Sequence, residues 1–140
     1  MPTLTVKKLW DAHPYPDNPC DTTLFENQCA IRMSVALRGA GADLGSFVGA
    51  RCYPNLKHDP RHVLRAQELA NWLAGQTTLV GTVTKYKRAT FADFVGKKGI
   101  VFIQDGWGPT DHIDVWDGSQ MKGGSADYFA RGAVWFWELE

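Results

Sequence analysis

Residues 27–39 read NQCAIRMSVALRG, and the fold depends on what this stretch forms. Its Ala, Arg, Met and Leu residues favour a helix, although the apolar residues of 29–35 also alternate as in a strand. The end of the stretch decides between the two, because a cationic last turn at Arg38 followed by Gly39 is typical of a helix C-terminus. With Asn27 as its N-cap, we predict a helix that carries Cys29 in its first turn and ends at Gly39.

Cys29 has the position of a nucleophile in this predicted helix. Unsatisfied backbone N–H groups and the positive end of the helix dipole stabilise a thiolate there, and the thiolate is the reactive form of cysteine. A buried Cys that merely begins a core helix is the competing interpretation. Asn27 and Gln28 are candidates to donate an amide hydrogen bond to an oxyanion beside the Cys29 N–H, or simply to cap the helix.

A second helix and several strands follow. Asp59 as a cap and Pro60 at the first helical position predict a helix that runs to Gly75. Short runs rich in branched and aromatic residues then predict strands: TLVGTVT at 78–84, GIVFIQD at 99–105, HIDVWDG at 112–118 and AVWFWEL at 133–139. Helices followed by strands indicate the α+β class, and we expect a sheet of about four to five strands with helices on one side. The length suits a single domain over residues 1–140.

His112 is the strongest candidate for the base that a cysteine nucleophile needs. It opens the strand HIDVW after the glycine-rich loop DGWGPTD, so it can project into a cleft. Strand alternation places His112, Asp114 and Trp116 on one face, and Ile113 and Val115 on the other face, which we expect to pack against the helices.

The other histidines are weaker candidates. His13 lies in the proline-rich coil of residues 11–22 and is expected to be exposed. His58 and His62 have a spacing found in metal sites, but the predicted helix start lies between them, so they would not share a helical face. We therefore expect no metal site.

The third catalytic group stays open from the residues alone. Asp114 shares a strand face with His112, but side chains two apart on a strand lie side by side and rarely orient one another. Asp117, in a DG turn, is typical of a turn residue. Asp127 lies beyond that turn, where a returning segment can pass beside His112, and it is the preferred candidate. Trp107, in the loop before His112, is a candidate for lining a substrate groove.

Composition excludes several classes of protein. The 140 residues are 44% hydrophobic with a formal net charge of zero, which indicates a globular chain and argues against non-specific nucleic-acid binding. No run approaches the roughly 18–20 apolar residues that span a bilayer, so we expect no membrane insertion. The N-terminal MPTLTVKKLW lacks the apolar stretch of a signal peptide, so we expect synthesis in the cytoplasm without one.

Four stretches resemble the type VI secretion amidase effector 4 family: NQCAIRMSVAL, FVGKKGIVFI, HIDVWDGS and VWFW. The resemblance covers most of the chain from residue 25 onward. It implies a papain-like, NlpC-type cysteine peptidase fold, in which an N-terminal helix carrying Cys29 packs on an antiparallel sheet carrying His112. It also implies that Cys29 is the nucleophile, that His112 is the general base, and that no metal or organic cofactor is needed.

The same resemblance implies a substrate and partners. Family members are antibacterial amidases that hydrolyse the γ-D-glutamyl–meso-diaminopimelate bond in the peptide stems of Gram-negative peptidoglycan. The type VI secretion apparatus injects them into the periplasm of rival bacteria, and a cognate periplasmic immunity protein protects the producer by blocking the active-site groove. Two alternatives stay open: another thiol acyl-transfer enzyme, such as a D,D-crosslink endopeptidase, and a non-catalytic cell-wall binding module.

The chain departs from the family pattern at the third residue. Family members carry an Asp in a loop shortly after the His strand, and a local disulfide can brace this loop. Here the corresponding stretch SQMKGGSADYF has no cysteine, and Asp127 is its only carboxylate. Asp127 is therefore the predicted third residue, with Asp114 as the alternative. Cys20 and Cys52 are candidates for a disulfide that would leave Cys29 as the free thiol.

Overall fold

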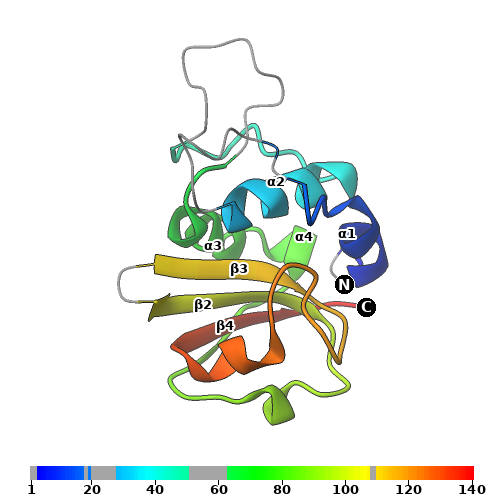
Figure 1. Cartoon of the computed structure of the whole chain (residues 1–140). Helices are drawn as coiled ribbons and strands as arrows, with labels where there is room; N and C mark the ends of the chain where they lie inside the picture. The colour runs from blue at the N-terminus through cyan, green and yellow to red at the C-terminus, as the bar shows by residue number, and fades with distance from the viewer. Residues whose placement is uncertain (1–2, 18, 20–27, 51–62, 108–109) are drawn as a thin grey trace.

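An antiparallel sheet of four strands forms the base of the described part of the chain (Figure 1). The computed structural model describes residues 3–17, 19, 28–50, 63–107 and 110–140. In spatial order the strands are β1 (Thr84–Tyr86), β4 (Ala133–Glu138), β2 (Gly99–Trp107) and β3 (Thr110–Trp116). All three strand pairings are antiparallel. β3 is therefore an edge strand, and one side of its backbone is left for other parts of the chain to cover.

Helices lie over one face of the sheet, and short 3-10 turns lie over the other (Figure 1). The helices are α1 (Val6–Ala12), α2 (Cys29–Gly39), α3 (Ala66–Ala74) and α4 (Thr77–Val80). The turns are η1 (Phe91–Asp93) and η2 (Ala126–Ala130). This arrangement confirms the α+β class and the antiparallel sheet. In the described part of the chain, no helix is both long and apolar enough to cross a bilayer.

Strand alternation divides the core between the two faces. In β2, Ile100 and Phe102 pack with the helices, whereas Val101 and Ile103 pack with residues of the opposite face. β3 follows the same rule, with Ile113 and Val115 under the helices and Trp116 on the opposite face. The expected facing of this strand is therefore confirmed. His112 and Asp114 occupy the positions between these apolar residues, which brings two polar side chains to the edge of a buried sheet.

α2 ends at Gly39 as predicted, but a different glycine closes the helix. Gly39 is the last helical residue and Ala40 is the C-cap, while Gly41 has a φ of 103°. The Ala42 N–H donates to the Leu37 carbonyl and the Gly41 N–H donates to the Arg38 carbonyl, which is the Schellman pattern. Gly41 is thus the glycine that the helix end requires for its left-handed backbone.

Gly39 has a different role from capping. A Cβ atom at Gly39 would lie 2.6 Å from the Cβ of Ala12. The glycine therefore permits a close approach of α1 to α2, and this approach sets the position of the segment that comes after α1.

Three further elements differ from the sequence prediction. The second predicted helix is observed as α3, which begins at Ala66. Before it, the N–H of the buried Val63 donates to the Ser34 hydroxyl and not to a helical carbonyl. Residues 59–62, where the helix was predicted to begin, lie outside the described ranges. Thr77–Val80 forms a short helix where a strand was predicted, since the N–H groups of Val80 and Gly81 donate to the carbonyls of Gln76 and Thr77. Helix α1 was not predicted from the sequence. Its N-cap is Thr5, whose hydroxyl accepts the Lys8 N–H.

A substitution at Gly39 tests the close approach of the two helices. Gly39→Ala is expected to lower the free energy of unfolding by about 1–3 kcal/mol, because overpacking against Ala12 outweighs the better helix propensity of alanine. The matched control is Gly75→Ala, whose added Cβ would meet its nearest atom, the Trp72 carbonyl oxygen, at an ordinary 3.5 Å. Denaturant unfolding of both variants measures the difference. Equal stability of the two would contradict the packing argument.

Candidate active site

Cys29 is the first residue of α2 and is 8% exposed. The residue before it, Gln28, occupies the N-cap position, makes no capping hydrogen bond with its side chain and is buried. The first backbone N–H groups of a helix have no intrahelical acceptor, and their dipoles favour a negative charge at this end. The Cys29 thiol also donates to the carbonyl of Asp111 at 3.6 Å. The predicted location of Cys29 in the first helical turn is therefore confirmed, next to strand β3.

His112 lies one residue beyond Asp111 on β3, and its ring is largely buried beside Cys29. Its Nε2 atom lies 2.9 Å from Oδ2 of Asp114. Burial opposes the charged ring, but hydrogen bonds to Asp114 and to the Cys29 side chain, together with the charges of both, raise the pKa of His112 from 6.5 to about 9. The site therefore favours a protonated His112 at neutral pH, a state that suits a thiolate–imidazolium pair.

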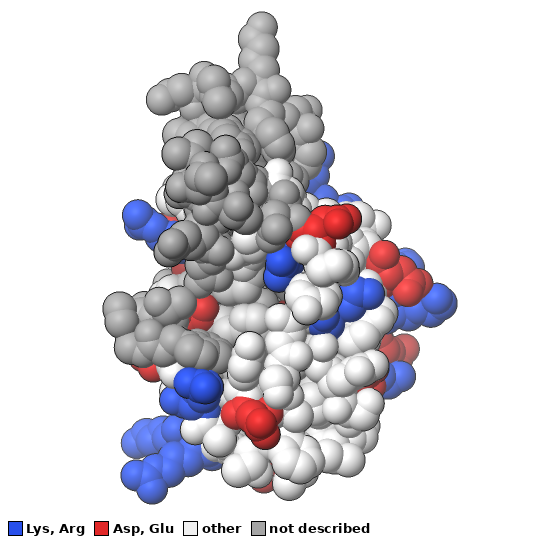
Figure 2. Space-filling model, in the orientation of Figure 1, with Lys and Arg blue, Asp and Glu red and all other residues white. Residues whose placement is uncertain are grey.

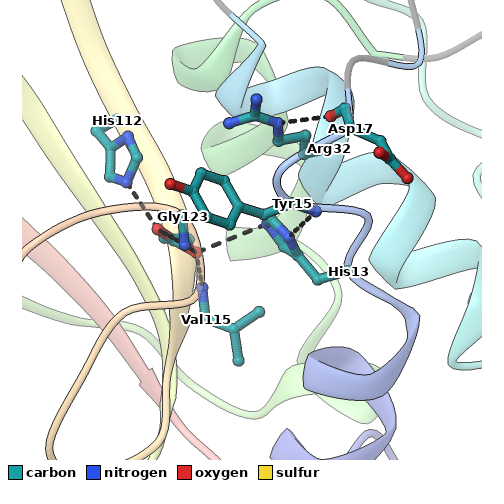
Figure 3. Close-up of polar contacts among 8 residues, drawn as sticks. His13, Tyr15, Asp17, Arg32, His112, Val115 and Gly123 are labelled. Carbon is teal, nitrogen blue, oxygen red and sulfur yellow. Dashed lines mark hydrogen bonds and ion pairs between the residues drawn. The ribbon is translucent and has the colours of Figure 1, made fainter.

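Asp114 is the carboxylate that meets His112, and it is 1% exposed. Its Oδ1 accepts the Val115 N–H at 2.8 Å, and its Oδ2 accepts the Gly123 N–H at 2.9 Å. In Figure 3, dashed lines from the His112 ring and from the backbone nitrogens of Val115 and Gly123 meet at this carboxylate. Side chains two apart on a strand were expected rarely to orient one another, but Asp114 does hydrogen-bond His112. Two backbone N–H groups hold the carboxylate at the strand edge, where the ring of His112 reaches it.

Asp127 does not take the predicted place beside His112. It is exposed at the start of η2, where its own N–H donates to the Ser125 hydroxyl, as in a capping turn. The residue after it, Tyr128, is the one that contacts His112, with ring centroids 5.0 Å apart and planes at 85°. The returning segment thus passes beside His112 as expected, but it presents an aromatic edge and directs its carboxylate to solvent.

The remaining candidates fall into three groups. Asp117 accepts the N–H groups of Ser119 and Gln120 and is the turn residue that was predicted. Trp107 ends β2, so it belongs to a strand and not to a loop. The remaining candidate positions lie outside the described residues: Asn27, His58, His62, Cys20 and Cys52.

His13 is the residue that the sequence interpretation placed wrongly. It was expected to be exposed in a coil, yet it is 5% exposed, and its Nε2 atom lies 3.6 Å from Oδ1 of Asp114. Burial lowers the pKa of His13 to about 4; Asp114 opposes the shift, and the charges of Arg32, Lys122 and His112 add to it. A signal was present in the sequence, since the Thr5 cap with apolar residues at 6 and 9 is typical of a short helix that packs on a core.

The described residues contain no group of three or more His, Cys, Asp or Glu side chains arranged to hold a metal ion. The geometry brings together a thiol at a helix N-terminus, an imidazole, and a buried carboxylate that is hydrogen-bonded to that imidazole. This order of groups is the one that nucleophilic catalysis by a thiol requires.

Comparison with known proteins places this arrangement in a family. The model of the type VI secretion system (T6SS) amidase effector protein 4 family matches residues 25–137. The chain belongs to this family. The matched range includes Cys29, His112 and Asp114, and it begins after His13. No curated protein matches the chain.

Solved structures of amidase effectors share the fold. The Tae4–Tai4 effector–immunity complex from Enterobacter cloacae aligns with a TM-score of 0.74 and 22% identity over 98% of this chain and 99% of that one. Tae4 from Enterobacter cloacae aligns with a TM-score of 0.72 and 22% identity over 98% and 97% of the two chains. Tae4 from Salmonella typhimurium, in complex with Tai4 from Enterobacter cloacae, gives 0.70 and 21% identity over 98% and 99%. These structures support the α+β fold described above.

Two carboxylates that come after His112 in the sequence offer a matched pair of variants. In Asp114→Asn the midpoint of the His112 titration is expected to fall, because the hydrogen bond and charge that stabilise the imidazolium are lost. Asp127→Asn removes an exposed carboxylate and is expected to leave the midpoint unchanged. NMR titration of the His112 ring measures both. A lowered midpoint in Asp127→Asn alone would restore Asp127 as the partner.

The raised pKa of His112 also predicts how stability depends on pH. The pKa of His112 is about 9 in the folded state, against 6.5 for an unperturbed histidine. The stabilisation from the bound proton is therefore full below pH 6.5 and is lost as the pH rises through about 9. The difference in Tm between wild type and His112→Gln should therefore be larger at about pH 6 than at about pH 10. A difference that does not change with pH would contradict the raised pKa.

Proposed function

We propose that the protein is an antibacterial cysteine amidase that hydrolyses the γ-D-glutamyl–meso-diaminopimelate bond in peptidoglycan stem peptides. Membership of the T6SS amidase effector family supports an amidase that acts on peptidoglycan. The observation that carries cysteine catalysis is the chain of contacts from Cys29 to His112 and from His112 to Asp114. The choice of bond rests on the family resemblance of the sequence.

The proposed reaction begins with the Cys29 thiolate, which attacks the γ-carbonyl carbon of D-glutamate. The tetrahedral oxyanion is stabilised by backbone N–H groups at the N-terminus of α2, including that of Cys29, with the Gln28 amide as a further donor. His112 then gives its proton to the amine of diaminopimelate, and the carbon–nitrogen bond breaks to leave a thioester on Cys29. Water, deprotonated by His112, hydrolyses the thioester and regenerates the thiol.

Asp114 has the role of the orienting group in this mechanism. Its Oδ2 atom binds His112 at Nε2, which leaves Nδ1 of the ring as the nitrogen that serves the thiol. A buried carboxylate in this place holds the ring in one tautomer and stabilises the imidazolium that the reaction needs. Asp114 therefore replaces Asp127 as the proposed third catalytic residue, and Trp107 remains a proposed groove residue.

Delivery and inhibition complete the proposal. The family is defined by type VI secretion, so the protein is proposed to act in the periplasm of a target bacterium after injection by that apparatus. The Tae4 structures from Enterobacter cloacae and Salmonella typhimurium include complexes with Tai4 immunity proteins. We propose by analogy that a cognate immunity protein binds this effector over its active-site groove and protects the producing cell.

Digestion of purified Gram-negative peptidoglycan tests this function. Wild type should release fragments that leave glycan-linked dipeptides ending in D-glutamate, identified by mass spectrometry. Cys29→Ala should slow this release at least about a thousandfold, since loss of a catalytic nucleophile removes the covalent route. Cys52→Ala, assayed in reducing buffer, is the matched control for loss of a thiol and should cleave like wild type.

Each other outcome points to a different function. Cleavage by wild type at another bond would indicate a different thiol enzyme, such as a D,D-crosslink endopeptidase. Intact stems with wild type, together with sacculus binding that survives alkylation of Cys29, would indicate a wall-binding module. Equal cleavage by Cys29→Ala and wild type would exclude Cys29 as the nucleophile.

A further inference from the structure

His13 comes from the end of α1, far from the catalytic residues in the sequence, yet its ring lies beside the buried carboxylate of Asp114. The histidine side chain is 2% exposed and its Nε2 lies 3.6 Å from Asp114 Oδ1. In Figure 3, His13 and His112 approach this carboxylate from different directions, one from the segment after α1 and the other from β3. The Asp114 carboxylate is thus placed between two histidine rings.

The hydrogen bond on the other nitrogen of His13 determines its tautomer. The backbone N–H of Tyr15 donates to Nδ1 of His13 at 3.2 Å, so Nδ1 must be an acceptor without a proton. A neutral imidazole then carries its hydrogen on Nε2, which is the atom that faces Asp114. His13 therefore presents a polar N–H, and not a lone pair, to the oxygen of the carboxylate that does not bind His112.

The segment that holds His13 is attached to the helix that carries Cys29. Arg32, one turn after Cys29 on α2, donates from Nε to the Asp17 carbonyl at 3.0 Å, and its guanidinium lies 4.9 Å from the centre of the Tyr15 ring. These contacts fix residues 15–17 against α2. Because His13 is bonded to Tyr15 within the same segment, its ring is held relative to both Cys29 and Asp114.

Burial keeps His13 neutral, and the cationic groups around it add to this effect. Asp114 on β3 is the acidic group that faces it, and the cationic groups that face it are Arg32 on α2, Lys122 in the segment after β3, and His112. A neutral donor can orient Asp114 without cancelling its charge, whereas a second imidazolium would compete with His112 for that charge.

We propose that His13 is a positioning residue, which holds the Asp114 carboxylate in the orientation that supports His112 and so extends the catalytic arrangement to four side chains. This proposal rests on the proposed function. It assigns a role in the active site to the N-terminal segment, which lies before the residues matched by the family model.

Peptidoglycan hydrolysis by three variants tests the proposal. His13→Phe keeps a buried ring but removes the N–H, and its kcat should fall about tenfold with KM unchanged, the effect of losing one polar contact to a charged group. His13→Gln supplies an amide N–H and should recover most of that loss. The control, Leu9→Ala, empties a buried position of the same helix and should lower Tm without changing kcat below the transition.

The outcomes separate this proposal from the proposed function. If wild type does not cleave peptidoglycan, the proposed function fails. If wild type cleaves and His13→Phe has the same kcat, the positioning role is overturned; a loss of kcat in Leu9→Ala equal to that in His13→Phe would also overturn it. The tautomer offers a test without any variant, because ¹⁵N NMR of wild type should show the Nε2–H form of His13 at neutral pH, and an Nδ1–H form would overturn the proposal.

Discussion

Burial of a carboxylate costs several kcal/mol unless hydrogen bonds or opposite charges replace the water that it loses. Asp114 is 1% exposed, and the parts of the chain around it satisfy its two oxygens. One backbone N–H comes from β3 itself, another comes from the segment after β3, and histidines approach from β3 and from the end of α1. The positions of these four groups depend on one another, because each must reach the same carboxylate.

The same constraint explains how residues that are distant in sequence form one site. β3 is at the edge of the sheet, so the side chains of His112 and Asp114 can be covered by other segments without breaking a strand pairing. The N-terminus of α2 meets this edge and brings the Cys29 thiol to the Asp111 carbonyl. On the other side, Gly124 allows its backbone to approach closely, since a Cβ there would lie 2.9 Å from Nε2 of His112. The imidazole is therefore enclosed between a helix end and a glycine-rich return.

The sequence predicted the elements whose pattern is local. Runs rich in branched and aromatic residues identified the three longer strands, β2, β3 and β4, and the run from Cys29 to Gly39 identified α2, because composition is a property of the segment itself. The strand prediction was wrong at residues 77–80. A short run of β-branched residues can form either a strand or a helical turn, and the rest of the fold determines which one forms. The assignment of Gly39 as the cap was also wrong: its lack of a side chain serves the contact with Ala12, and Gly41 supplies the left-handed backbone.

By itself the sequence predicted the α+β class and two members of the proposed site, Cys29 and His112, because a thiol at a helix start and a histidine at a strand start are local features with known chemistry. Only the tertiary structure decided between Asp114 and Asp127, since the distance from His112 depends on how the chain returns over the strand edge. It also decided that His13 is buried against Asp114 and not exposed. Both results have the same physical reason: a buried carboxylate needs several polar partners at once. Partners from separate elements can be identified only when those elements are packed together.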